Sequence, residues 1–245
     1  MSLLDKIKAQ IMALIDTANA KTGKTDADLT TAVSSLVDGY GGSGGEDFVK
    51  FITSLRQLFY KATITEIDDL QLNVPNLGVI HNNIKHYNIA SIIEETRGVK
   101  KLSIIKDTFE DGIMDINAFA KSNTTIEEIS FNGKRIILSE VTSAFTYASN
   151  LKKINAILDC SSAKTLTGMF ARTSNIETVA FYPDSIFVNL DMSNAEFLSD
   201  DSIQSIIDGL ATVETAQTLT LHAAVKAKLT EEQIATITSK NWTLA

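Results

Sequence analysis

The chain has 245 residues, 44% of them apolar, a net charge of −8 and a single cysteine, Cys160. The acidic balance argues against a groove for nucleic acid, and one cysteine excludes an internal disulfide framework and a cysteine-rich zinc site. No apolar run approaches the roughly 18 residues of a membrane span, so we expect no membrane insertion. Asp5, Lys6 and Lys8 interrupt the apolar start of the chain, so we also expect no Sec export.

Residues 1–40 are predicted to form a helical anchor. Its apolar seam, with steps of three and four residues, consists of Leu4, Ile7, Ile11 and Leu14. The seam fits either a short amphipathic helix that packs on its neighbour or a helix for docking and self-association. Residues 41–47 then form a glycine-rich linker, which is the clearest domain boundary in the chain. We therefore expect a second domain over residues 48–245.

Within this second domain, apolar residues recur at a step of 25 positions in an L-x-x-L-x-L-like pattern. The regular sets are Ile126/Ile129/Phe131, Leu151/Ile154/Ala156 and Ile176/Val179/Phe181, after Val99/Leu102/Ile104 and a candidate first set Ile67/Leu70/Leu72. A period of roughly 20–29 residues indicates a leucine-rich-repeat solenoid, because each unit is too small to bury its own apolar face and must share a core with its neighbours. The predicted fold class is thus an α/β repeat solenoid with a short parallel sheet. Residues 73–97 are irregular, and the pattern assigns them no register.

Charged residues occupy the positions between the apolar residues of successive units. In chain order these columns are Lys100 and Lys101, Glu127 and Glu128, Lys152 and Lys153, and Glu177 and Thr178. The sign alternates from one unit to the next, and opposite charges on neighbouring strands help to fix strand register. We interpret the columns as a structural ladder, with a charged ligand site as the alternative.

The C-terminal part of the domain is predicted to be a cap. Asp200 or Asp201 is expected to begin a helix, and an apolar strand pattern follows at residues 216–221. Thr230 and Gln233 have the spacing of a capping box at the start of another helix. A last strand or turn is expected at residues 241–244, where Trp242 is interpreted as part of the final core layer, with sugar binding as the alternative.

The sequence offers little reaction chemistry. The three histidines lack metal-ligand spacing, and neighbouring carboxylates such as Asp68 and Asp69 would point to opposite faces of a strand. Cys160 is expected to be buried or idle. We therefore expect no catalytic residue, no metal and no cofactor.

The motif at residues 169–179, followed by Tyr182-Pro183-Asp184-Ser185-Ile186, resembles the BspA-like leucine-rich repeats of bacteria and their phages. The segments at 205–210, 229–233 and 242–244 resemble the closing part of such proteins in phages and prophages of Gram-positive bacteria, and residues 22–42 resemble their leader. The chain departs from the pattern at Ser149 and Ser174, where the family has cysteine.

This resemblance implies a phage virion structural protein, namely a fibre, a spike or a baseplate-associated protein, assembled in the bacterial cytoplasm. Residues 1–40 would contact other virion proteins or self-associate, with a homotrimer among the options, and the solenoid would bind a host-surface glycan or protein. The alternative is a bacterial leucine-rich-repeat protein of adhesion or scaffolding. The family carries no catalytic residues.

Overall fold

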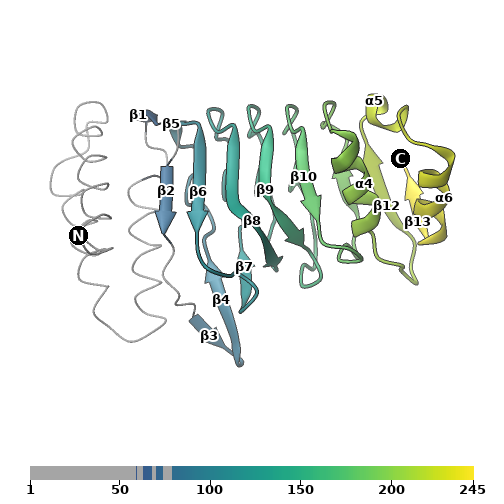
Figure 1. Cartoon of the computed structure of the whole chain (residues 1–245), viewed down its shortest axis with the longest axis horizontal. Helices are drawn as coiled ribbons and strands as arrows, with labels where there is room; N and C mark the ends of the chain where they lie inside the picture. The colour runs from purple at the N-terminus through teal and green to yellow at the C-terminus, as the bar shows by residue number, and fades with distance from the viewer. Residues whose placement is uncertain (1–58, 60–62, 68–69, 74–78) are drawn as a thin grey trace.

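The computed structural model describes residues 59, 63–67, 70–73 and 79–245. A row of mostly parallel strands extends along the long axis of this part of the chain, and a few helices lie at its C-terminal end (Figure 1). The described residues therefore have α/β character. The predicted anchor of residues 1–40, with its seam of Leu4, Ile7, Ile11 and Leu14, and the linker of residues 41–47 lie outside the described residues.

Short strands make up most of the described elements, and the helices follow late in the chain. The strands are β1 (Thr63–Ile67), β2 (Leu70–Asn73), β3 (Val79–His81), β4 (Ile84–Asn88), β5 (Arg97–Val99), β6 (Lys101–Ile105), β7 (Ile113–Asp115), β8 (Glu128–Leu138), β9 (Lys153–Asp159), β10 (Thr178–Phe181), β11 (Leu190–Met192), β12 (Gln217–Leu221) and β13 (Trp242–Leu244). The helices are α4 (Asp200–Gly209), α5 (Ala223–Lys226) and α6 (Glu231–Ser239).

Strands β2, β6, β8, β9 and β10 pair in parallel in this order. Glu128 of β8 pairs with Lys153 of β9, and Lys153 pairs with Thr178 of β10, so both steps are 25 residues. The apolar sets predicted from the sequence lie at these strands, and the side chains of all four sets from Val99 onward are buried. The predicted strand positions are therefore confirmed for β8, β9 and β10, and the step of 25 is confirmed at the starts of these strands. Farther along the register shifts, since Arg135 pairs with Ile157 and Ile157 pairs with Ala180.

A second row of stacked backbone lies opposite these strands. Residues 116–123, 141–148 and 166–173 form turns whose amides donate to carbonyl oxygens of the next turn, as in Ala120 N to Ala144 O at 2.8 Å and Phe145 N to Met169 O at 2.9 Å. This ladder places apolar side chains of each turn against those of the strands.

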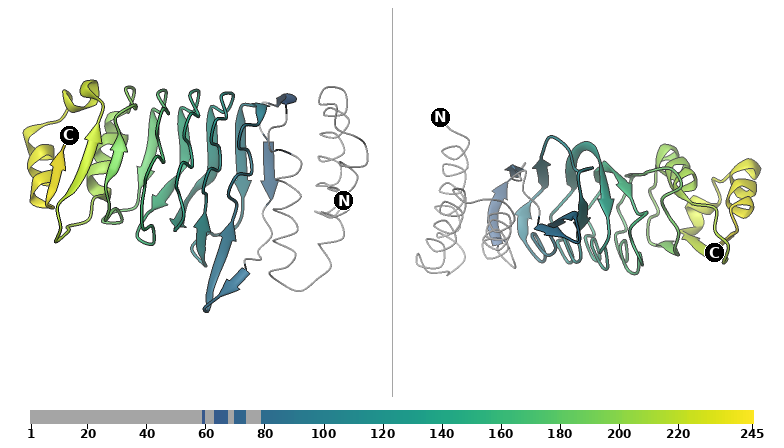
Figure 2. Two further views of the ribbon diagram at one scale, coloured as in Figure 1. Left: turned by 180° about the vertical axis from the view of Figure 1, so that it is seen from behind. Right: turned by 90° about the horizontal axis from the view of Figure 1, so that it is seen from below.

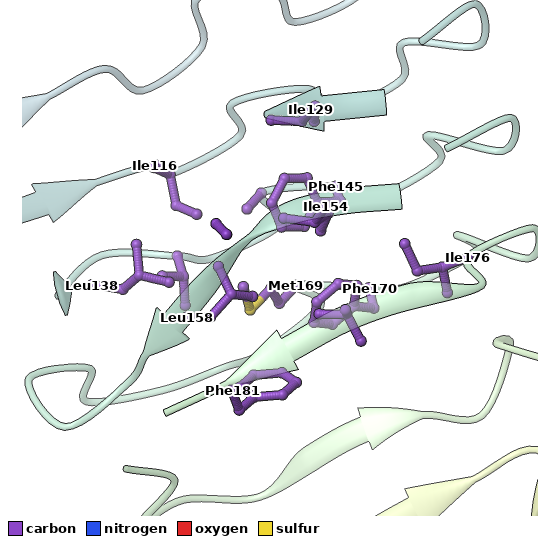
Figure 3. Close-up of a cluster of buried hydrophobic side chains, with 14 of the residues drawn as sticks. Ile116, Ile129, Leu138, Phe145, Ile154, Leu158, Met169, Phe170, Ile176 and Phe181 are labelled. Carbon is purple, nitrogen blue, oxygen red and sulfur yellow. The ribbon is translucent and has the colours of Figure 1, made fainter. Parts of the chain in front are cut away.

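The core between the two rows is continuous from one layer to the next (Figure 3). The ring centroids of Phe145 and Phe170 are 5.4 Å apart, and those of Phe170 and Phe181 are 6.5 Å apart. Ile154 and Leu158 project from β9 into the same core. Because adjacent layers share these contacts, each layer depends on its neighbours for stability.

The stretch without a predicted register contains an antiparallel hairpin of β3 and β4. Asn82 and Asn83 both have positive φ, at 50° and 61°, which is the conformation of a type I′ turn. β4 pairs with β7, and β7 pairs with the second half of the 11-residue strand β8, whose first half pairs with β6. The hairpin projects past the ends of the other strands, as Figures 1 and 2 show. β8 thus joins two branches of one sheet.

Helix α4 closes the free edge of β10. Ser202 Oγ accepts from Val179 N at 3.0 Å, and Ser205 Oγ accepts from Phe181 N at 2.8 Å. These hydroxyls take the place of the carbonyls of a further strand. The prediction that a helix begins at Asp200 or Asp201 is confirmed, because α4 begins at Asp200. Its N-cap is Ser199, whose hydroxyl accepts from Ser202 N, and both aspartates lie in the first turn, where they interact favourably with the helix dipole.

The last layer contains the parallel strands β11, β12 and β13 together with α5 and α6. The predicted capping box of Thr230 and Gln233 is present at the start of α6. Trp242 is buried, and its Nε1–H donates to the carbonyl of Ala211 at 2.8 Å. The predicted C-terminal strands, helices and core position of Trp242 are thus confirmed.

Candidate interaction surfaces

The charged columns predicted from the sequence lie at the starts of β6, β8, β9 and β10. Glu128 lies between two lysines: its Oε1 is 3.5 Å from Lys101 Nζ and 3.8 Å from Lys153 Nζ. Lys152 Nζ is 3.1 Å from Glu127 Oε2. The alternating signs therefore form the cross-strand ion pairs that the ladder interpretation predicts. Because these side chains are partly exposed, each pair stabilises the fold only slightly.

Backbone hydrogen bonds between neighbouring strands position the remaining column residues. The carbonyl of Lys100 accepts from the amides of Glu127 and Glu128. Glu177 N and Thr178 N both donate to Lys152 O, at 2.8 and 2.9 Å, and the side chains of Glu177 and Thr178 are exposed. The columns thus follow one edge of the exposed sheet face.

Small polar residues follow the charged columns on this face. Ser103, Ser130 and Asn155 pair across β6, β8 and β9, and Asn155 Nδ2 donates to Ser130 Oγ at 3.1 Å. Ser130 is buried, and its Oγ accepts from Asn132 N at 3.1 Å, so the exposed turn at Asn132 and Gly133 lies beside these small side chains.

At those far ends, Arg135, Asp159 and Tyr182 form a cluster. Arg135 donates to Asp159 Oδ2 from Nε at 3.0 Å and from Nη2 at 2.6 Å, and its guanidinium carbon is 3.6 Å from the centroid of the Tyr182 ring. Asp159 also accepts from Ser161 N at 2.9 Å. Burial alone would raise the pKa of Asp159, but the hydrogen bonds from Ser161 and Arg135 outweigh it and hold the pKa below its ordinary value.

Exposed apolar side chains flank this cluster. Ile157 pairs with Arg135 in the sheet and is 36% exposed, and Tyr182 is 37% exposed. The cluster was not predicted from the sequence, because its members come from three different layers. The 25-residue step could have placed Ile157 one layer before Tyr182.

A second charged network joins β4 to the segment that follows β6. Asp111 accepts from Lys85 Nζ at 2.8 Å, from Lys106 Nζ at 3.0 Å and from the Tyr87 hydroxyl at 2.9 Å. Burial would raise the pKa of Asp111, but these three hydrogen bonds lower it to about 2. Burial and the nearby carboxylate also raise the pKa of Tyr87. Lys106 Nζ lies 4.6 Å from the Tyr87 ring centroid. This network fixes the loop before β7 and keeps Asp111 ionised.

A groove of about 470 Å³ separates α4 from the start of α6. It is lined by Asp200, Ile203, Lys228, Thr230 and Gln233. The groove offers a carboxylate and an ammonium group beside one apolar side chain, so it suits a polar ligand.

Other reactive side chains have structural surroundings. Cys160 is buried, and this burial, together with Asp159, raises the pKa of its thiol. His222 caps α5, because its Nδ1 accepts from Ala224 N at 3.2 Å. In the described part of the chain, no group of three or more His, Cys, Asp or Glu side chains is arranged to hold a metal ion. Among the described helices, none has the length and apolar character needed to cross a membrane.

The chain matches no family model, no curated protein and no solved structure. The described residues define an α/β protein with a parallel-strand sheet and few helices.

Proposed function

We propose that this chain is a non-enzymatic phage virion structural protein, whose described region is a BspA-like leucine-rich-repeat solenoid that displays a binding surface. The protein would be a fibre, a spike or a baseplate-associated component. The observation that carries the proposal is the step of 25 residues between the paired positions at the starts of β8, β9 and β10, namely Glu128, Lys153 and Thr178. A constant step with a shared core is what a repeat array requires.

The way in which the array ends supports a displayed scaffold. An open parallel edge exposes unpaired backbone groups and invites aggregation. In this chain Ser202 and Ser205 of α4 accept hydrogen bonds from the β10 amides, and further strands and helices follow. Terminal caps of this kind are needed wherever a stack of repeats meets solvent.

Two carboxylates of the described region belong to hydrogen-bonded networks. Asp111 and Asp159 are both held ionised by hydrogen bonds that lower their pKa. A general acid at neutral pH needs the opposite shift. These two carboxylates therefore suit fixed structural networks.

Residues 1–40 would attach the array to other virion proteins or join copies of the chain, with a trimer among the options. The displayed region would then contact a host-surface glycan or protein. Two surfaces are available for contacts: the exposed sheet face with its charged columns, and the groove between α4 and α6.

Peptide mass spectrometry of density-purified phage particles from the source culture tests this proposal. We expect peptides from residues 154–164 at a ratio to known head or tail proteins that stays constant across the particle band. A host-cell membrane protein of similar abundance serves as the contamination control. If the protein is abundant in cells that make no phage and is missing from particles, the proposal is wrong and a bacterial adhesion or scaffold protein takes its place.

A further inference from the structure

We propose that the groove between α4 and α6, together with the exposed ring of Phe197 beside it, is a binding site for a glycan. This inference rests on the proposed function, because it names the class of ligand for one of the surfaces available for contacts. The site belongs to the C-terminal cap of the array and uses none of the charged columns.

Phe197 stands at a position where the two preceding layers have an asparagine. Asn150 and Asn175 each precede a buried apolar residue, and each donates from Nδ2 to a carbonyl of the layer before it at 2.7 Å. Phe197 likewise precedes the buried Leu198, and Ser199 N donates to the layer before it, as do the amides two positions after both asparagines. Because a phenylalanine side chain cannot donate, Phe197 does not make this link between layers.

The Phe197 ring is directed away from the core. The residue is 52% exposed, whereas its neighbour Leu198 is fully buried. Lys228 Nζ donates to the carbonyl of Leu198 at 3.3 Å, and Lys228 lines the groove, so this hydrogen bond places the Phe197 segment at the rim. An exposed aromatic ring at the rim of a groove can stack against the apolar face of a sugar ring.

Hydrogen bonds between and within α4 and α6 hold the walls of the groove in place. Gln233 Nε2 of α6 donates to Gln204 Oε1 of α4 at 3.0 Å, and Gln233 Oε1 accepts from Thr230 N at 3.0 Å. The groove of about 470 Å³ has the size of a small-ligand site. A standard protein interface needs roughly 20–30 residues on each partner, so a groove with five lining residues fits a glycan better than a protein.

The polar groups that remain available in the groove match sugar hydroxyls, which both donate and accept hydrogen bonds. The Asp200 carboxylate is an acceptor, and within the described part of the chain it takes part in no hydrogen bond or ion pair. The Lys228 ammonium group retains N–H donors beyond the one that Leu198 uses, and the Thr230 hydroxyl can also donate. Ile203, which also lines the groove, is buried and offers an apolar contact.

Binding of the full-length chain to cell-surface polysaccharide tests the proposal. The probe is polysaccharide extracted from the source culture and immobilised for biolayer interferometry. One aliquot is first digested with proteinase K, and another is oxidised with periodate, which cleaves the vicinal diols of sugars. We expect the chain to bind the untreated and the proteinase-treated samples equally and to lose binding after periodate treatment.

Two pairs of variants locate the site. Phe197→Ala removes the ring, and Phe187→Ala is its control, because Phe187 is 47% exposed and does not line the groove. Asp200→Asn removes the charge of the acceptor, and Asp201→Asn is its control, since both aspartates lie in the first turn of α4 but only Asp200 lines the groove. We expect Phe197→Ala and Asp200→Asn each to raise the Kd for the polysaccharide several-fold, and both controls to bind like the wild type.

Circular dichroism of each variant shows whether the chain is folded. If one of the two site variants fails to fold, Lys228→Gln replaces it, with the same loss of binding expected. Three results would each overturn the proposal: a wild-type chain that does not bind the polysaccharide, binding that proteinase K abolishes and periodate does not, or site variants that bind like the wild type. Each of these leaves the proposed function standing where peptides of the chain are found in purified particles, so the two failures are distinguishable.

Discussion

Replacing Phe145 by alanine tests the shared core most sharply. The side chain is 1% exposed, and its ring lies 5.4 Å from that of Phe170 in the next layer. Burial of a phenylalanine side chain, the cavity that its removal leaves, and the lost aromatic pair together cost about 3–5 kcal/mol. We expect Phe145→Ala to lower the free energy of unfolding by this amount.

Urea unfolding followed by circular dichroism measures the loss. With a slope of about 2 kcal/mol per molar urea, the midpoint should fall by roughly 1.5–2.5 M. Phe197→Ala is the matched control, since Phe197 is 52% exposed, and removal of an exposed side chain changes the free energy of unfolding by less than about 0.5 kcal/mol. If the two variants lose the same free energy, Phe145 is not in a shared core.

Further changes test other parts of the fold. Ser202→Ala with Ser205→Ala leaves the β10 amides without acceptors, so urea unfolding should show a loss of about 1–3 kcal/mol per site, against no loss for the exposed Ser162→Ala. Asp159→Asn removes a carboxylate whose pKa is lowered in the fold. The ionised Asp159 side chain stabilises the fold fully above the unfolded pKa of about 4, and this stabilisation is lost as the pH falls through the lower folded pKa. The difference in urea midpoint between the wild type and Asp159→Asn should therefore be largest at neutral pH and become smaller in acid. Gly209→Ala would place a Cβ 2.7 Å from a side-chain atom of β10. We expect this substitution to destabilise the protein by about 1–3 kcal/mol in the same assay, although alanine is normally the better helix former. A gain in stability would contradict this packing.

The regular layers could be predicted from the sequence because their signal is periodic. Ile129, Ile154 and Val179 lie 25 residues apart and are all buried, as a constant strand step requires. The charged columns followed from the same period, and the ion pairs of Glu128 confirm their register. The C-terminal capping box could be recognised because its two side chains, at positions 230 and 233, contact each other's backbone within one helical turn.

Contacts that break the period could not be predicted. The β3–β4 hairpin pairs with β7 and not with the main row, and three-residue strands carry too little pattern to assign. The N-cap residue of α4 was not assigned from the sequence, because Ser199, Asp200 and Asp201 all have side chains able to cap a helix. The cluster of Arg135, Asp159 and Tyr182 depends on three layers and on the irregular register between β8 and β9.

Electron cryo-microscopy of purified phage particles tests the central claim most directly. The proposal predicts an elongated density at the head, tail or baseplate surface, with parallel strands about 4.8 Å apart that fit residues 79–245 and end in the layer of α4 and α6. Particles that contain the protein in this density would establish a virion scaffold. Particles from the producing culture that lack such density, while the protein remains abundant in the cell fraction, would contradict the proposed function.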